Sequence, residues 1–237
     1  MFLLSFVAIL LILIVLIFVF VNSYKQKVLK ISPVQIGLFI LSLVILYLGM
    51  PFWALAFAQK AQQAQAGQLY KFAVLVSAIP SVRANMLEEL GNHYVAFSDG
   101  QNAVKAFEDA LDLNESKIAT VQLCRLYTIK GEYKSAINMC QKLELSQIIA
   151  VNYILQDDYK IAYEVINKKI QNNKKPTCWD YATRAYIYRQ TGKKDLFEKN
   201  YKKALELCPD SEALKNLYKN KNYYKDLYSQ YKKQYNF

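Results

Sequence analysis

Two long apolar runs at the N-terminus constrain this chain more than any other feature of its sequence. Residues 2–21 contain one polar side chain, Ser5, and residues 34–58 contain no charged residue. At about 1.5 Å per residue, a helix of either length covers the roughly 30 Å hydrocarbon layer of a bilayer. We therefore predict transmembrane helices at 2–21 and 34–58, which make the protein an integral membrane protein in contact with the lipid bilayer.

A cleavable signal peptide is the alternative interpretation of the first run. Such peptides usually begin with a basic region and end at a cleavage site of small residues. No Lys or Arg precedes Lys25, and the residues from Val21 to Tyr24 make a poor cleavage site. We expect the first run to be retained as a span.

The loop between the two runs indicates the orientation. Residues 22–33 are too few for a domain, so the two helices should form a tight hairpin. The loop carries three lysines, whereas the flank after the second run holds Lys60 and Lys71. Because basic residues favour the cytoplasmic side, we predict a cytoplasmic loop and an extracytoplasmic C-terminal domain, in a bacterial inner membrane.

The remainder of the chain should be helical, since it contains few helix breakers. Residues 84–116 carry a spaced pattern in which small residues, Gly91 and Ala103, would let two antiparallel helices approach, and Tyr94 and Phe107 would fill the space between them. The pattern returns in residues 117–145 and 178–211 and is degenerate in 146–175. Its recurring members are Leu123, Cys124, Tyr127, Gly131 and Ala136, then Tyr153, Ala162 and Ile166, then Tyr188, Gly192, Tyr201, Ala204 and Pro209.

This spacing resembles the tetratricopeptide repeat (TPR) family, whose pattern is W-x2-L-G-x2-Y, then A-x3-F, then P, with a period of 34 residues. The resemblance implies about four helical hairpins over 84–211, stacked into an α-solenoid. We therefore predict an all-α chain: a two-helix transmembrane hairpin over 1–58, a helical stalk or half-repeat over 59–83, the repeats, and one capping helix over 212–237.

The capping helix should carry a stripe of apolar and aromatic side chains that covers the last repeat. Binding to a membrane surface or to a partner is the alternative role for the stripe. Its members are Leu217, Tyr224, Tyr228, Tyr231 and Tyr235.

The family resemblance also implies a groove lined by the first helix of each hairpin, where such folds bind peptides or helices of other proteins. We expect Arg125 and Tyr186 to lie there on surface positions. Glu88 stands where chaperone-binding members carry a clamp lysine, so that specialised function is not expected. The expected groove residues are Asn85, Glu88, Asn92, Val121, Arg125, Trp179, Tyr186 and Arg189.

The four cysteines form no CxxC pair, and His93 is the only histidine, so we expect no metal site and no cofactor. Antiparallel pairing in the last hairpin should bring Cys178 and Cys208 together. They would form a disulfide in an oxidising compartment, or remain small reduced residues of the core. Cys124 and Cys140 face each other less clearly.

The net charge of +11 indicates either a solvated basic surface or attraction to an acidic partner or anionic lipid headgroups. No motif supports nucleic-acid binding. The sequence also contains no P-loop, GxGxxG, HExxH or GxSxG motif, so we do not expect an enzyme.

These features together predict a membrane-anchored scaffold or adaptor that binds a protein or peptide, in an envelope assembly or maturation complex. The plan is similar to the TPR subunit of bacterial cytochrome c maturation, which has two spans and a repeat domain. A structural accessory subunit of a large membrane complex is the alternative.

Overall fold

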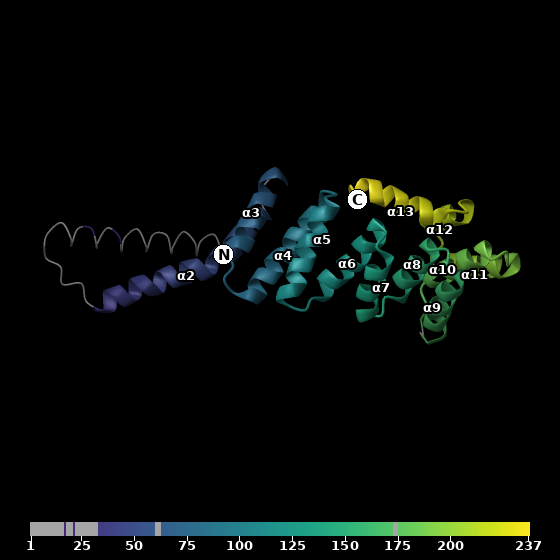
Figure 1. The fold of residues 1–237 in the computed structure, drawn as a ribbon, viewed down its shortest axis with the longest axis horizontal. Coiled ribbons are helices and arrows are strands. Elements are labelled where there is room, and N and C mark those ends of the chain that lie inside the picture. The colour runs from purple at the N-terminus through teal and green to yellow at the C-terminus, as the bar shows by residue number, and fades with distance from the viewer. Residues whose placement is uncertain (1–16, 18–20, 22–32, 60–62, 173–174) are drawn as a thin grey trace. The chain divides into compact units, whose positions relative to one another are not determined.

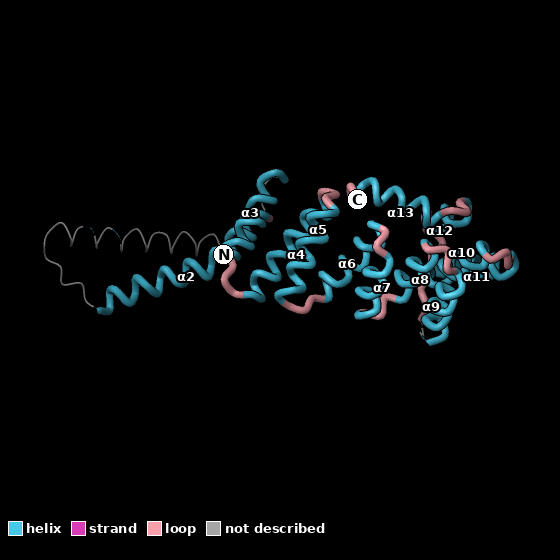
Figure 2. Tube along the Cα trace, viewed as in Figure 1, coloured by secondary structure: helices cyan, strands magenta, loops and turns pink. Residues whose placement is uncertain are grey.

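A computed structural model describes residues 17, 21, 33–59, 63–172 and 175–237, and throughout these ranges the regular structure is helical (Figures 1 and 2). The chain divides into two compact units, 1–93 with 112–115, and 94–111 with 116–237. The first unit holds α2 (Pro33–Ala58), α3 (Gln63–Val76) and most of α4 (Pro80–Ala96). The second holds most of α5 (Gly100–Leu113), then α6 (Lys117–Lys130), α7 (Tyr133–Lys142), α8 (Ser146–Leu155), α9 (Tyr159–Asn172), α10 (Cys178–Gln190), α11 (Lys194–Leu207), α12 (Glu212–Lys219) and α13 (Tyr223–Gln234).

The second apolar run forms the helix α2, as predicted. Pro33 opens it, at the position where proline costs no hydrogen bond. The segment Phe39–Ala58 is long and apolar enough to cross a membrane. Apart from Ile17 and Val21, the first predicted span at 2–21 lies outside the described residues.

The residues after α2 differ from the predicted stalk. Helix α3 folds back on α2: Ala54 of α2 packs with Ala73 of α3 and Met86 of α4 in one apolar cluster. Pro51 and Val76 line the same small cavity, so α3 runs antiparallel to the end of α2. The C-terminal part of α2 therefore forms a helical hairpin with α3, in the region where the sequence predicts the end of a span followed by a stalk or half-repeat.

The α2–α3 hairpin has the same sequence spacing between its two helices as the later helix pairs. In each of five successive helix pairs, a buried residue of the first helix stands twelve positions before a buried residue of the second. Small side chains at such positions allow two helices to lie close together. The pairs are Ala54 with Ala66, Gly91 with Ala103, Cys124 with Ala136, Ala150 with Ala162, and Ala185 with Phe197.

The turns between paired helices share a left-handed residue. Gly131 has φ 92° and Gly192 has φ 74°, while Ser98 and Asp157 adopt φ 60° at the equivalent place. Each stands seven positions after the first buried residue of its pair. The Gly131 N–H donates to the carbonyls of Tyr127 and Thr128, which ends α6. Both glycines of the recurring pattern, Gly131 and Gly192, thus stand in turns.

The C-terminal segment forms two helices where we predicted one. Leu214 and Leu217 of α12 are fully buried, so α12 covers the last hairpin. The chain then breaks, because Asn220 is extended and its side-chain Oδ1 accepts the Asn222 N–H at 2.8 Å. Helix α13 turns back and packs against α6 and α8, as the yellow helix in Figure 1 shows.

Candidate partner-binding cleft

Helix α13 lies along the first helices of the second, third and fourth predicted repeats and leaves an open cleft beside them. The cleft has a volume of about 450 Å³. Its walls come from α6, α8 and α10 on one side and from α12 and α13 on the other. We call this space the α13 cleft; its lining residues are Arg125, Ile129, Gln147, Ile148, Val151, Trp179, Ala213, Tyr223, Tyr224, Leu227, Tyr228 and Tyr231.

Two of the predicted groove residues meet in the α13 cleft. Arg125 of α6 is exposed and Trp179 of α10 is half-buried, and both line the space. Val121 is half-buried on α6 and does not line it. Three further predicted residues, Asn85, Glu88 and Asn92, belong to α4 in the first unit and are not among the residues that line the cleft.

The expectation that Tyr186 lies on the surface is wrong. Its side chain is 1% exposed, because Tyr224 of α13 covers it. The two rings meet edge to face with centroids 4.8 Å apart. The Tyr224 hydroxyl lies 2.9 Å from Thr183 Oγ1, so the only polar atom that α13 inserts here is hydrogen-bonded. Tyr186 is therefore part of the core.

Arg189 also has a different role from the one predicted. Its guanidinium donates to the carbonyls of Leu217 at 2.8 Å, Tyr218 at 2.9 Å and Asn220 at 2.5 Å. The cation lies 5.2 Å from the ring centre of Tyr186. A charged donor on the last carbonyls of a helix satisfies groups that have no partner within it. Arg189 thus holds the end of α12 and is not available to a partner.

The electrostatics of the α13 cleft are simple. Burial raises the pKa of Tyr228 to about 12, and the nearby positive charge of Arg125 acts in the opposite direction. Burial also raises the pKa of Tyr224. Both phenols are therefore neutral at physiological pH. The cleft offers aromatic and aliphatic walls with one exposed cation, a combination suited to apolar side chains next to a carboxylate.

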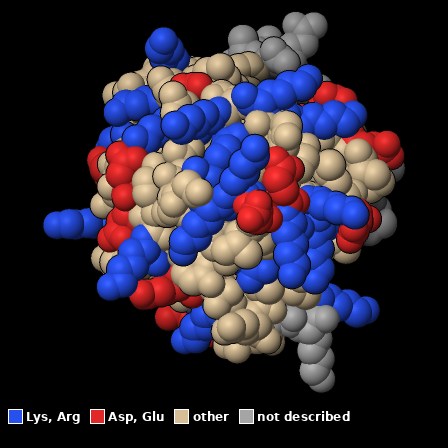
Figure 3. Space-filling model, turned by 90° about the vertical axis from the view of Figure 1, so that its right-hand side faces the viewer, with Lys and Arg blue, Asp and Glu red and all other residues tan. Residues whose placement is uncertain are grey.

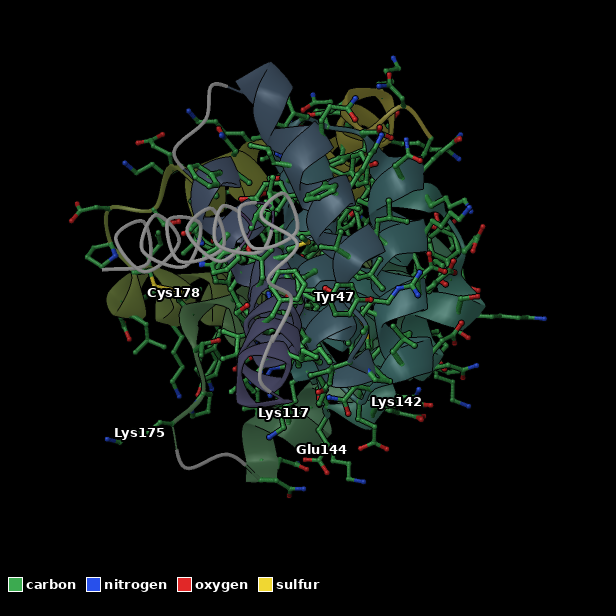
Figure 4. All side chains as sticks on the ribbon, turned by 90° about the vertical axis from the view of Figure 1, so that its left-hand side faces the viewer. Tyr47, Lys117, Lys142, Glu144, Lys175 and Cys178 are labelled. Carbon is green, nitrogen blue, oxygen red and sulfur yellow. A yellow bond between two sulfur atoms is a disulfide. The ribbon has the colours of Figure 1, made fainter. Side chains whose placement is uncertain are left out.

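Two disulfides hold the helix pairs on which the cleft is built. Cys178, labelled in Figure 4, joins Cys208 across α10 and the end of α11, with Cα atoms 5.9 Å apart. Cys124 joins Cys140 across α6 and α7, with Cα atoms 5.2 Å apart. Both separations lie within the usual range for a bridge. Cys178 and Cys208 are therefore disulfide-bonded, and so are Cys124 and Cys140.

No protein-family model matches the sequence, and a search of curated proteins finds no match. Solved structures do match. A tetratricopeptide repeat protein from Parabacteroides merdae gives a TM-score of 0.50 at 16% identity, covering 86% of this chain and 80% of that one. TPR-like repeats of a kinesin light chain from Podospora anserina give 0.53 at 15% identity, covering 67% and 92%.

This chain has a TPR-like fold. The likeness confirms the fold that the spaced small residues predicted. Several TPR-like features escaped the sequence interpretation. Gln147 and Val151 line the α13 cleft from α8, in the degenerate repeat for which the sequence analysis names no groove residue. The spacing of Ala150 and Ala162, equal to that of the other repeats, was the signal that could have found them.

The charge of the TPR-like array is uneven. Residues 160–237 contain 18 basic and 8 acidic residues, a net charge of +10, whereas residues 59–159 contain 9 basic and 11 acidic residues. Figure 3 shows lysine and arginine side chains spread over one face, with acidic groups between them. Basic groups that attract an acidic molecule are therefore concentrated in the last third of the chain.

Proposed function

We propose that this protein is a membrane-anchored adaptor whose TPR-like array binds a partner protein or peptide in the α13 cleft. The observation that carries the proposal is the cleft itself, which lies between α13 and the first helices of the repeats, where the family resemblance places the binding groove. Arg125 and Trp179 stand on its walls with the tyrosines of α13. Aromatic side chains and arginine are the residue types that dominate binding energy at protein interfaces.

The first support for a membrane anchor is the surface of α2. Ile36, Ile40, Val44 and Leu48 are all exposed, as are Leu41 and Ile45 on other sides of the same helix. A helix that is apolar all round needs an apolar environment on every side. The bilayer would supply it, with the first predicted span completing a hairpin.

The disulfides support an extracytoplasmic array. Disulfides persist in oxidising compartments and are rare in the cytosol of most organisms. An array outside the cytoplasm is also the orientation that the lysines of the loop predict. We therefore place the array on the outer side of a bacterial inner membrane, in an envelope assembly or maturation complex.

The uneven charge favours an acidic partner. The net charge of +10 after residue 159 would steer acidic polypeptides toward this end of the array and would reject basic ones. Arg125 in the cleft would then pair with a carboxylate of the bound segment.

The test is site-specific photocrosslinking in the native membrane, followed by mass spectrometry. A photoreactive residue at Arg125 should capture a defined partner. The matched control is Lys134, an exposed residue of α7 that does not line the cleft and should not capture that partner. Capture at neither position, together with co-purification of membrane subunits in mild detergent, would instead support the accessory-subunit alternative.

A further inference from the structure

Helix α13 occupies the groove in which the partner would bind. Its Tyr224 fills a slot on the groove wall, with its hydroxyl 2.9 Å from Thr183 Oγ1 and its ring 4.8 Å from that of Tyr186. A segment of the chain itself thus shows which ligand chemistry the groove accepts, namely an aromatic side chain carried by a helix.

Beyond Tyr224, α13 is held by half-buried side chains and by exposed polar contacts, and Tyr223 and Tyr228 pack against the core cluster that contains Tyr224. Tyr224 is the one buried residue of this helix. An exposed ion pair of 2.7 Å joins Lys225 and Asp157, and exposed ion pairs contribute little to stability. At the far end, the Gly100 N–H donates to the Tyr235 carbonyl at 3.1 Å. Most of α13 therefore rests on the groove without being buried in it.

Open space flanks α13 on two sides. One is the α13 cleft, and the other is a cavity of about 490 Å³ between α12 and α13. Tyr223, Leu227 and Tyr231 line both spaces. Both spaces are open to solvent, so these side chains of α13 border surface grooves and are not enclosed on all sides by the core.

The preceding segment has anchors other than α13. Leu214 and Leu217 of α12 are fully buried, and Arg189 binds the carbonyls at the end of α12. The break at Asn220–Asn222 separates the two helices. Consequently α13 can leave the groove while α12 stays on the last hairpin.

We propose that α13 is an internal occupant of the groove, and that the partner presents an amphipathic helix with aromatic residues at positions i, i+4 and i+7 that takes its place. Tyr224, Tyr228 and Tyr231 have this spacing and are the template. Recognition of a helix in a groove commonly uses such anchors. Because α13 is tethered, its effective concentration is high, and only a helix that fits better displaces it. This inference rests on the proposed adaptor function.

The experiment uses a labelled synthetic peptide of residues 221–237 and the full chain in detergent micelles. The unmodified chain should bind the peptide weakly, because α13 already fills the groove. Tyr224→Ala in the chain should release α13 and increase the affinity for the peptide about tenfold or more. A peptide carrying the same substitution should not bind, and Ser229→Ala, at an exposed position of α13, should leave the weak binding unchanged.

Two results would overturn the proposal. The first is a Tyr224→Ala chain with full helical content that binds the peptide no better than the unmodified chain. The second result comes from the unmodified chain and can be obtained even if the Tyr224→Ala variant does not fold. Hydrogen exchange should be about 100-fold faster in α13 than in α10. Equal protection of the two helices would show that α13 is a fixed element. A partner captured at Arg125 by a chain with a fixed α13 would retain the adaptor function and reject displacement. Release of α13 without any captured partner would count against the adaptor function.

Discussion

Removal of the Cys178–Cys208 disulfide should lower the stability of the array by a calculable amount. The bridge closes a segment with a sequence separation of 30 residues. In the chain-entropy model, a loop of that size removes conformational freedom from the unfolded chain worth about 3.5 kcal/mol at 25 °C. For a domain of this size each kcal/mol shifts the melting temperature by roughly 2–4 °C, so the double serine variant should melt roughly 10 °C lower.

The second bridge provides a matched comparison. Cys124 and Cys140 are separated by 16 residues, which gives about 3 kcal/mol in the same model. Both double serine variants should be followed by circular dichroism during heating and in urea, with and without a thiol reductant. Reductant should destabilise the unmodified chain and have no effect on a chain that lacks all four cysteines. An unchanged melting temperature in the Cys178→Ser/Cys208→Ser variant would refute the reasoning, since it would mean that the bridge does not constrain the unfolded chain.

The remaining predictions concern single side chains. Tyr186→Ala should destabilise the array by about 3 kcal/mol or more, because it empties a buried aromatic site, and a lower urea midpoint would report it. Arg189→Ala should cost about 2 kcal/mol by removing a charged donor from three carbonyls, with faster hydrogen exchange in α12. Gly91→Leu should cost about 1–3 kcal/mol through overpacking at a buried position, seen as lost helical content on heating. The hydrogen bond from Lys225 lowers the pKa of Asp157, so this contact is complete above pH about 4. The protection of α13 amides from hydrogen exchange, corrected for the intrinsic exchange rate at each pH, should decrease as the pH falls through the lowered value.

The sequence predicted the repeats well where small residues alone determine the packing. Gly91, Cys124 and Ala136 stand at buried positions, and Gly131 ends its helix in the left-handed conformation. These features depend on local conformation and on side-chain size, and both can be predicted from a single sequence.

The course of the last 26 residues depended on contacts that are distant in sequence. No glycine or proline marks the break at Asn220–Asn222, and the tyrosine spacing continues across it. The carbonyls at the end of α12 are bound by Arg189, about thirty residues earlier. Helix α13 then returns over the groove, and its Tyr224 packs on the ring of Tyr186, which is buried. The candidate site was therefore predicted only in part.

The earliest helix pair was missed for a different reason. Ala54, Ala66 and Ala73 repeat the spacing of Gly91, Ala103 and Ala110, but the first of them lies inside an apolar run. In an apolar, membrane-spanning type of sequence the neighbouring positions are apolar as well. A repeat pattern of small residues therefore cannot be recognised from hydrophobicity there.

Helix α2 belongs both to the proposed membrane anchor and to the first helix pair, and this has a mechanical consequence. Its exposed apolar portion and its packed end, where Ala54 meets Ala73 and Met86, belong to one continuous helix. On the proposed topology, no flexible linker separates the bilayer from the first helix pair. Transmembrane helices change tilt when the thickness of the hydrocarbon layer changes. Such a tilt would move α3 and α4 as a rigid lever, so the lipid composition around the anchor would set the angle at which the first repeat leaves the membrane.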